Sequence, residues 1–292
     1  MRHFSKLAAG ILLLFGSLSV ATAQGKTEAV KPSTKSDDMS DWKLVWADEF
    51  DKEGPPNPAN WSFEKGFVRN EEFQWYQEAN AFCRKGILTI EARRERVPNP
   101  NYAIGASEWR RKREYAEYAS SSLKTEGLHA WQYGRFEMRA RIDTRAGMWP
   151  AFWTIGSEGE WPSGGEIDIM EFYRGNLLAN LVWGTDKRWS GKWHSTSRPI
   201  ANFKDPKWSS KYHIWRMDWD ENAITLFVDG QELNKTDLKE TVNGDGSGKN
   251  PFKQPHYLLL NLAIGGQNGG DPSKTKFPAR FEVDYVRVYQ KK

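Results

Sequence analysis

The chain has 292 residues and a formal net charge of +4, and two of its positive charges, Arg2 and Lys6, lie in its first 23 residues. The remaining charge near +2 is too small to favour nucleic-acid binding. Because Cys83 is the only cysteine, a disulfide framework and a thiolate metal site are excluded. Fifteen tryptophans are more than a core usually needs, and they favour a cleft lined with flat apolar rings that stack on sugars.

The first forty residues have the pattern of an export signal and a linker. Residues 1–23 combine a basic start, the apolar stretch "LAAGILLLFGSLSV" and the small-residue pattern "ATA", which together predict a signal peptide. That stretch is too short and interrupted for a membrane span. Residues 24–41 are polar and without periodicity, which predicts a flexible linker. We therefore expect an exported monomer, periplasmic or secreted, with one folded domain over 42–292.

Alternation of apolar and polar residues dominates from residue 42 onward, as in half-buried strands. Strand runs, one of them continuous enough for a buried central strand, occupy residues 87–93, 136–142, 223–233, 257–266 and 281–289. Asp229-Gly230 is a hairpin signal, and residues 96–114 and 243–251 are predicted loops. No segment sustains a helical period. These patterns predict an all-β sandwich.

The segment "GGEIDIMEF", residues 164–172, places three carboxylates in an otherwise apolar run. On a regular strand Glu166 and Asp168 share a face, whereas Glu171, five residues from Glu166, faces the other side. One extra residue in a β-bulge, at Ile169 or Met170, would return Glu171 to the same face. We expect all three acids on one face, with Ile167 and one of the two bulge candidates in the core.

Three acids on one face have the chemistry of glycosidic bond cleavage with retention. That reaction needs one ionised carboxylate to attack the anomeric carbon and one protonated carboxyl to donate to the leaving oxygen. Like charges close together, and burial beside aromatic rings, raise a carboxyl pKa and keep one acid protonated. An exposed charged face or a Ca²⁺ site is the alternative interpretation of this segment.

The segment "GEIDIMEF" resembles the ExDxxE signature of glycoside hydrolase family 16, in its bulged, laminarinase-like form. The resemblance extends over most of the chain, through segments in family order: "LVWADEFD", "NEEFQWYQEANAF", "YGRFEMRARI", "GMWPAFWTIG", "HIWRMDWDENAITLFVDGQEL", "YLLLNLAIGGQNGGDP" and "VDYVRVYQ". It implies a β-jelly-roll sandwich of two antiparallel sheets with a concave substrate cleft. By motif position it implies that Glu166 is the nucleophile, Asp168 the assisting acid and Glu171 the general acid/base.

The resemblance also implies roles for residues around the acids. Trp149 and Trp153 share a strand face in "MWPAFW", and one or both are expected in the cleft. Trp161 precedes the catalytic segment, and Asn70 matches a sugar-contacting position. Trp183 matches a cleft element that in the family often carries a preceding histidine; here the preceding residue is valine. These five are the expected substrate-binding residues.

Two further features concern ions. Family members often hold a structural Ca²⁺ away from the chemistry, and Glu49 and Asp284 match the positions concerned, although no cofactor is expected for catalysis. The basic run 110–113, beside Trp109, would either reach an anionic or branched glycan or form a solvated loop. Trp189, Trp193 and His194 would form a cleft wall or a packed loop.

We expect a retaining, endo-acting glycoside hydrolase that cleaves a β-1,3- or mixed-linkage β-glucan. "GGQNGG" lacks the tryptophan that glucan-cleaving members often carry after these glycines, so an endo-β-galactosidase acting on galactans or galactose-containing host O-glycans is a second hypothesis. A non-catalytic carbohydrate-binding sandwich is a third, of another class.

Overall fold

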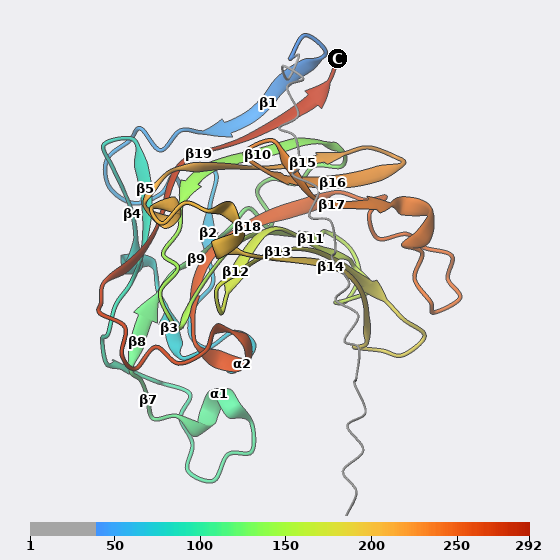
Figure 1. Ribbon diagram of the computed structural model, residues 1–292. Coiled ribbons are helices and arrows are strands. Elements are labelled where there is room, and N and C mark those ends of the chain that lie inside the picture. Colours follow the sequence, from blue (N-terminus) through green and yellow to red (C-terminus); the bar gives the residue numbers. More distant parts are fainter. Residues whose placement is uncertain (1–38) are drawn as a thin grey trace, which may run out of the picture. The chain divides into compact units, whose positions relative to one another are not determined.

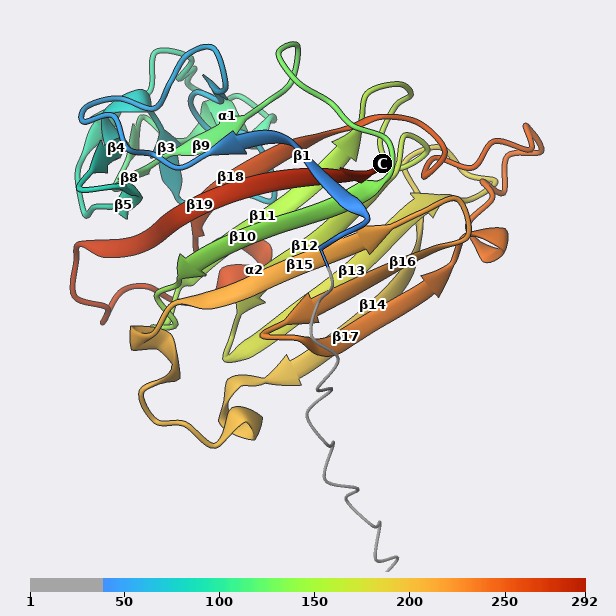
Figure 2. The ribbon, with the colours of Figure 1, turned by 90° about the horizontal axis from the view of Figure 1, so that it is seen from above.

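The computed structural model describes residues 39–292, which fold into two large antiparallel sheets packed face to face (Figures 1 and 2). The outer sheet has the order β17 (Gln231–Asp237), β16 (Ala223–Val228), β15 (His213–Trp219), β10 (Gly134–Arg141), β19 (Ala279–Lys291), β5 (Ile87–Ala92) and β4 (Ala81–Arg84), and β1 (Trp42–Asp48) pairs with β19. The predicted signal peptide and nearly all of the predicted linker lie outside the described residues.

The second sheet, called the cleft sheet below, carries the acids. Its order is β14 (Gly191–Pro199), β13 (Asn176–Gly184), β12 (Glu166–Tyr173), β11 (Met148–Gly156), β18 (His256–Ile264), β9 (Ser122–Lys124) and β2 (Ser62–Phe63). Figure 1 shows this sheet arching, with its concave side turned away from the outer sheet. The strands of the two sheets run in similar directions (Figure 2), as in aligned sandwiches.

Short elements cover one end of the cleft sheet. β3 (Gln74–Tyr76) pairs in parallel with β8 (Tyr118–Ser120), and β6 (Val97–Pro98) pairs with β7 (Tyr115–Ala116). The remaining elements are the single-turn helices α1 (Trp109–Lys112) and α2 (Gly266–Gly269) and the 3₁₀ turns η1 (Glu78–Asn80), η2 (Ile200–Phe203), η3 (Trp208–Ser210) and η4 (Leu238–Glu240). In the described part of the chain, no helix is long and apolar enough to cross a membrane.

The core lies between the two sheets and follows the predicted alternation. In β10, Phe136, Met138 and Ala140 are fully buried, whereas the charged residues between them face outward. The hairpin between β16 and β17 turns at Asp229 and Gly230, whose φ angles of 48° and 74° are the positive values that a tight primed turn requires. The all-β sandwich expected from the sequence is confirmed.

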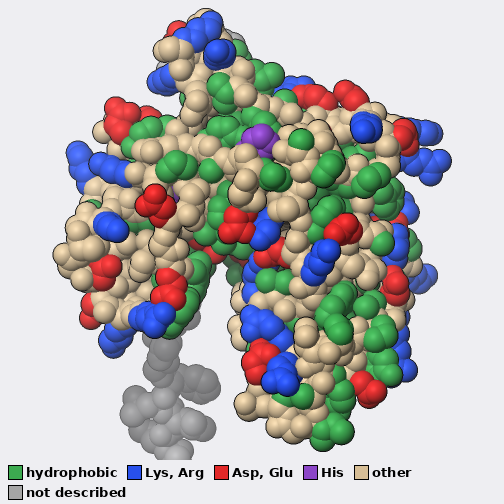
Figure 3. Space-filling view, turned by 180° about the vertical axis from the view of Figure 1, so that it is seen from behind, with side chains coloured by type: hydrophobic (Ala, Val, Ile, Leu, Met, Phe, Trp, Pro, Cys, Tyr) green, Lys and Arg blue, Asp and Glu red, His purple; other side chains and the backbone are tan. Residues whose placement is uncertain are grey.

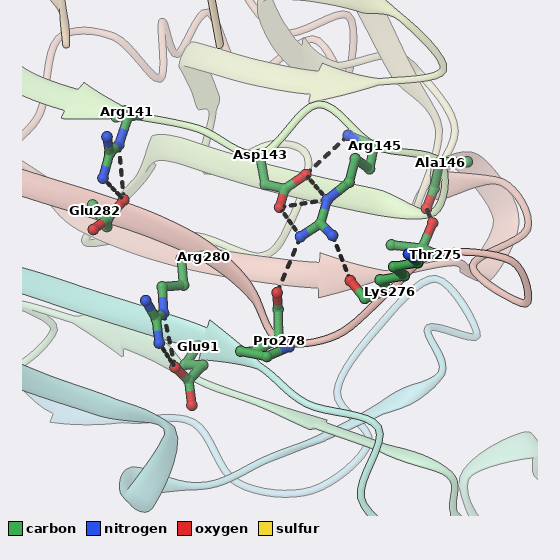
Figure 4. A network of polar contacts seen from close by, with 10 residues as sticks. All are labelled: Glu91, Arg141, Asp143, Arg145, Ala146, Thr275, Lys276, Pro278, Arg280 and Glu282. Carbon is green, nitrogen blue, oxygen red and sulfur yellow. Dashed lines mark hydrogen bonds and ion pairs between the residues drawn. The ribbon is translucent and has the colours of Figure 1, made fainter. Parts of the chain in front are cut away.

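The outer sheet carries cross-strand ion pairs between arginines and acids, and further pairs lie in the loops beside it (Figure 4). Arg280 bridges to Glu91 on the neighbouring strand at 2.8 Å, and Arg141 pairs in the same way with Glu282. The arginine of each pair remains open to solvent, which limits what the pair contributes to stability. The two pairs link neighbouring strands of the outer sheet.

Of the two residues expected to hold Ca²⁺, Glu49 follows directly after β1 and Asp284 lies on the neighbouring strand β19. Each carboxylate is bound by an arginine: Glu49 accepts two hydrogen bonds of 2.8 Å from Arg287, and Asp284 pairs with Arg139. Ca²⁺ takes six to eight oxygen ligands, and no group of three or more His, Cys, Asp or Glu side chains that could hold a metal occurs within residues 39–292. Both carboxylates are engaged by arginines, and the chemistry proposed for the acids uses no metal ion.

Candidate active site

A β-bulge in β12 sets the direction of the acids. Along β11, Phe152 pairs with Met170 and the next residue, Trp153, pairs with Asp168, so Ile169 is the extra residue. Both Ile169 and Met170 are fully buried in the core. The predicted bulge is confirmed, and the prediction that only one of these two residues enters the core is wrong: two consecutive side chains point inward because the bulge breaks the alternation.

The bulge places the third acid on the same face as the first two. Along β13, Asp168 pairs with Asn180 and Glu171 pairs with Leu178. Asn180 and Leu178 are two residues apart on a regular strand and share a face, so their partners Asp168 and Glu171 share one as well. Glu166, two residues before Asp168, completes the row of acids.

The acids lie in a cleft of about 830 Å³ on the concave side of the cleft sheet. All three line it, together with Trp149, Trp153 and further side chains from the neighbouring strands β11, β13, β14 and β18. The space-filling view shows the molecule hollowed between two lobes at its lower side (Figure 3). An open cleft across the strands admits the middle of a chain-like ligand.

Each glutamate accepts a hydrogen bond from an indole. Trp161 Nε1 donates to Glu166 Oε2 at 3.0 Å, and Trp149 Nε1 donates to Glu171 Oε1 at 2.7 Å. Asn180 lies between the acids on β13: its Nδ2 donates to Asp168 Oδ2 at 3.0 Å and to Glu171 Oε2 at 3.2 Å. These donors fix the carboxylates in place without neutralising them.

Burial raises the pKa values of all three acids, and repulsion between neighbouring carboxylates adds to this at the two glutamates. The pKa of Glu171 is well above its usual range, first because the carboxyl is desolvated and then because Asp168 carries a negative charge nearby. The pKa of Glu166 is raised by the same causes, with Glu171 contributing as well. Desolvation raises the pKa of Asp168 to about 6, against hydrogen bonds that lower it. The cluster therefore retains a proton near neutral pH, as acid catalysis requires.

Four of the five expected substrate-binding residues line the cleft. These are Asn70, Trp149, Trp153 and Trp161. Trp149 and Trp153 are only 4% and 6% exposed, because Trp149 is bound to Glu171 and the Arg69 guanidinium lies 5.0 Å from the ring centre of Trp153. They shape the floor of the cleft, whereas Trp161, at 38% exposed, presents a free ring face.

Trp183 was predicted in the cleft and is not there. It is 3% exposed and belongs to the core between the sheets, where its ring meets the edge of Phe252. The reason is strand parity: Asn180 faces the acids, so Val182 faces the cleft and Trp183 faces the opposite side. On the side of β13 that faces the acids, this position carries valine instead of an indole.

A buried polar network under the cleft was not found from the sequence. Trp153 Nε1 donates to Asn261 Oδ1 at 2.7 Å, and Asn261 Nδ2 donates to the Tyr76 hydroxyl at 3.2 Å. Glu72 is also buried and accepts from Gln74 Nε2 at 2.7 Å. A single asparagine within the apolar runs of β13 and β18 was the available signal, because an asparagine is costly there without partners.

The basic run ties its loop to the rim of the cleft. Arg110 lines the cleft, but its guanidinium donates to the Val68 carbonyl and ion-pairs with Glu108 at 2.9 Å. Arg113 donates to the Glu72 carbonyl at 2.5 Å. These contacts give the run a structural role in holding the loop.

A concave sheet with two glutamates and an aspartate on one bulged strand, each held by fixed donors, defines a glycoside hydrolase. The chain belongs to glycosyl hydrolases family 16, whose sequence model matches residues 69–287. It is 35% identical over 274 residues to a "Beta-glucanase" of Rhodothermus marinus, and the aligned region covers 88% of each chain.

Two solved structures show the same fold. One comes from work on endo-acting O-glycanases with which human gut microbes initiate mucin breakdown: TM-score 0.79, 31% identity, covering 87% of this chain and 92% of that one. The other is the laminarinase catalytic domain of Thermotoga maritima: TM-score 0.71, 32% identity, covering 86% of this chain and 99% of that one.

Proposed function

We propose that the protein cleaves internal bonds of a β-linked polysaccharide with retention, by double displacement. Glu166 attacks the anomeric carbon as Glu171 protonates the departing oxygen, which gives a glycosyl-Glu166 ester and a free chain end. Glu171, now ionised, takes a proton from water, and that water displaces Glu166. Asp168 lies between the two, and its negative charge adds to the desolvation that raises the pKa of Glu171 and keeps it protonated. One observation carries this proposal: the bulge at Ile169 places Glu171 on the face of Glu166.

The first candidate substrate is a β-1,3- or mixed-linkage β-glucan. The β-glucanase and laminarinase relatives support it, and their matches cover most of both chains. The cleft supports endo-action, because it is lined from β18 on one side of the acids to β14 on the other and so leaves room for sugars on both sides.

A second candidate is a galactose-containing glycan cleaved by endo-β-galactosidase action. It is favoured by the structural similarity to the O-glycanase, with a TM-score of 0.79 against 0.71 for the laminarinase. Trp183 lies in the core, and Asn268 of α2, in the "GGQNGG" segment, lines the cleft. Both differences replace an expected indole surface by smaller or polar groups, which leaves room for an axial hydroxyl.

Digestion of a glycan panel tests the proposal. Laminarin, lichenan, keratan sulfate and mucin O-glycans are incubated with the protein, and new reducing ends are counted, with Glu166→Gln as the control. Cleavage of laminarin or lichenan supports the first candidate, and cleavage confined to the galactose-containing glycans supports the second. Binding without cleavage across the panel would show a carbohydrate-binding sandwich and overturn the enzymatic proposal.

We also infer that the protein is exported. Residues 1–23 carry the basic, apolar and small-residue regions of a signal peptide. N-terminal sequencing of the protein recovered from cells and from the medium tests this: a start near Gln24 supports it, and a retained Met1 contradicts it.

A further inference from the structure

The most exposed rings of the cleft lie at its edge-strand end. Trp149 and Trp153 are nearly covered, whereas Trp189 and Trp193 are 56% and 49% exposed, and both line the same cleft. Trp189 lies at the tip of the hairpin between β13 and β14, and Trp193 lies on β14. A ring must be uncovered to stack on a sugar, so these side chains have the surface that the cleft floor lacks.

The strand register shows how far Trp193 lies from Glu166. Glu166 pairs with Val182, and Val182 pairs with Trp193, so the three residues form one row across β12, β13 and β14. Opposite residues share a face of the sheet, and two strand spacings amount to roughly 10 Å. That is about the length of two pyranose rings in an extended chain. Trp193 therefore lies on the path of a chain that crosses the strands through the acids.

The hairpin tip is held toward the cleft. Trp189 has a φ of 64°, a left-handed conformation that is rare for a bulky residue and is retained where the surroundings enforce it. The guanidinium of Arg188 lies 5.1 Å from the ring centre of Trp189 and binds both carboxylate oxygens of Glu160 at 2.7 Å. Glu160 precedes Trp161, whose indole binds Glu166. One ion pair thus connects the two loops that carry the exposed rings.

We infer that Trp193 and Trp189 form a sugar-stacking subsite on the β14 side, about two sugar residues of the substrate from the scissile bond. This inference rests on the proposed function, because its occupant is a pyranose of the same substrate chain whose bond the acids cleave. Ser195 faces the cleft two residues further along β14 and lines it, so its hydroxyl is available to a sugar hydroxyl. The subsite makes cleavage depend on chain length on this side of the acids.

The test uses the oligosaccharides that the unmutated enzyme releases from its polysaccharide, fractionated by length. Trp193→Ala should lower kcat/KM on the longest fractions by about five- to tenfold, mainly through KM, because the stacking contact is the same before and in the transition state. The shortest cleaved fraction should be unaffected. Trp193→Phe should retain most of the activity, since it keeps an aromatic face.

Lys192→Ala is the matched control, because Lys192 precedes Trp193 and points to the opposite face, over the ring of Trp183. Equal kcat/KM for Trp193→Ala and the unmutated chain at every length, with the melting temperature unchanged, overturns the subsite and leaves the proposed function intact. A loss of kcat/KM that is equal for all oligosaccharide lengths would overturn the subsite in the same way. If the unmutated chain cleaves nothing, the proposed function fails, and the subsite fails with it.

Discussion

Asp168 and Glu171 lie three residues apart on one strand and still face the same cleft, because Ile169 and Met170 between them both point into the core. An odd separation on a regular strand would have put Glu171 among apolar side chains. One extra residue therefore converts an unfavourable sequence into a row of acids. The bulge interrupts the hydrogen-bond ladder, and it places both glutamates on one face of the sheet.

Deleting residues of the bulge tests this relationship. Without Ile169, the strand is regular and Glu171 occupies an even position relative to Glu166, so the acids should stay on one face. We expect a folded protein with detectable activity, destabilised by about 2–5 kcal/mol through the lost core side chain. Deleting Ile169 and Met170 together makes the separation odd and turns Glu171 inward.

Urea unfolding and reducing-end assays on both deletion variants provide the measurement. The double deletion should abolish activity at any temperature at which the single deletion still works. Equal activity of the two would contradict the account of the bulge.

Glu166→Ala and Glu171→Ala should differ on a substrate with an activated aryl leaving group. That group departs without a proton, so the first step should survive the loss of Glu171 but not that of Glu166. On the polysaccharide, both variants should lose about 10²–10⁴-fold in kcat. A burst of aryl alcohol, followed by slow turnover, is expected from Glu171→Ala alone; a burst from Glu166→Ala would reverse the two roles.

The acid cluster should lower the stability of the folded protein at neutral pH. A carboxyl with a raised folded pKa binds its proton more tightly in the folded than in the unfolded chain, so stability is lost as the pH rises from about 4 through the folded pKa values. For Asp168 that value is about 6, and for Glu171 it is raised well above the usual range by burial. Glu171→Gln should therefore melt several degrees higher than the unmutated chain at about pH 8. Thermal scans at about pH 4 and pH 8 check this; a difference that does not shrink at the lower pH would contradict it.

The two indole donors should move opposite limbs of the pH–rate profile. Each hydrogen bond lowers the pKa of the glutamate that accepts it, Glu171 from Trp149 and Glu166 from Trp161. Trp149→Phe should shift the alkaline limb of kcat/KM to higher pH, because Glu171 must be protonated. Trp161→Phe should shift the acidic limb to higher pH, because Glu166 must be ionised. The profiles of both variants, measured on one substrate, serve as controls for each other, and identical shifts would disprove the separate assignments.

Strand alternation and the spacing of the acids were sufficient to predict the sandwich and the bulge from the sequence. The position of Trp183 could not be predicted, because β13 is buried on both faces and its two asparagines, Asn176 and Asn180, do not show by themselves which side is the cleft. The role of Asn180 becomes visible only when Asp168 and Glu171 are seen beside it.

The cleft floor depends on contacts between distant segments. Arg69 reaches Trp153 and Asn261 reaches Tyr76 across 84 and 185 positions of the chain, respectively, and no local pattern indicates such pairs. The calcium expectation rested on two acids alone, and the arginines that bind them come from other positions on the outer sheet. Local periodicity therefore predicts which residues face a cleft better than it predicts their partners.

The configuration of the first product tests the central claim most directly. Proton NMR, recorded during the first minutes of digestion and before mutarotation, shows which anomer the enzyme releases from a β-linked chain. Attack by Glu166 and then by water, both on the anomeric carbon, predicts that the β-anomer appears first and the α-anomer grows in later. An α-anomer released first would mean a single displacement by water, and the double displacement on the bulged strand would be contradicted.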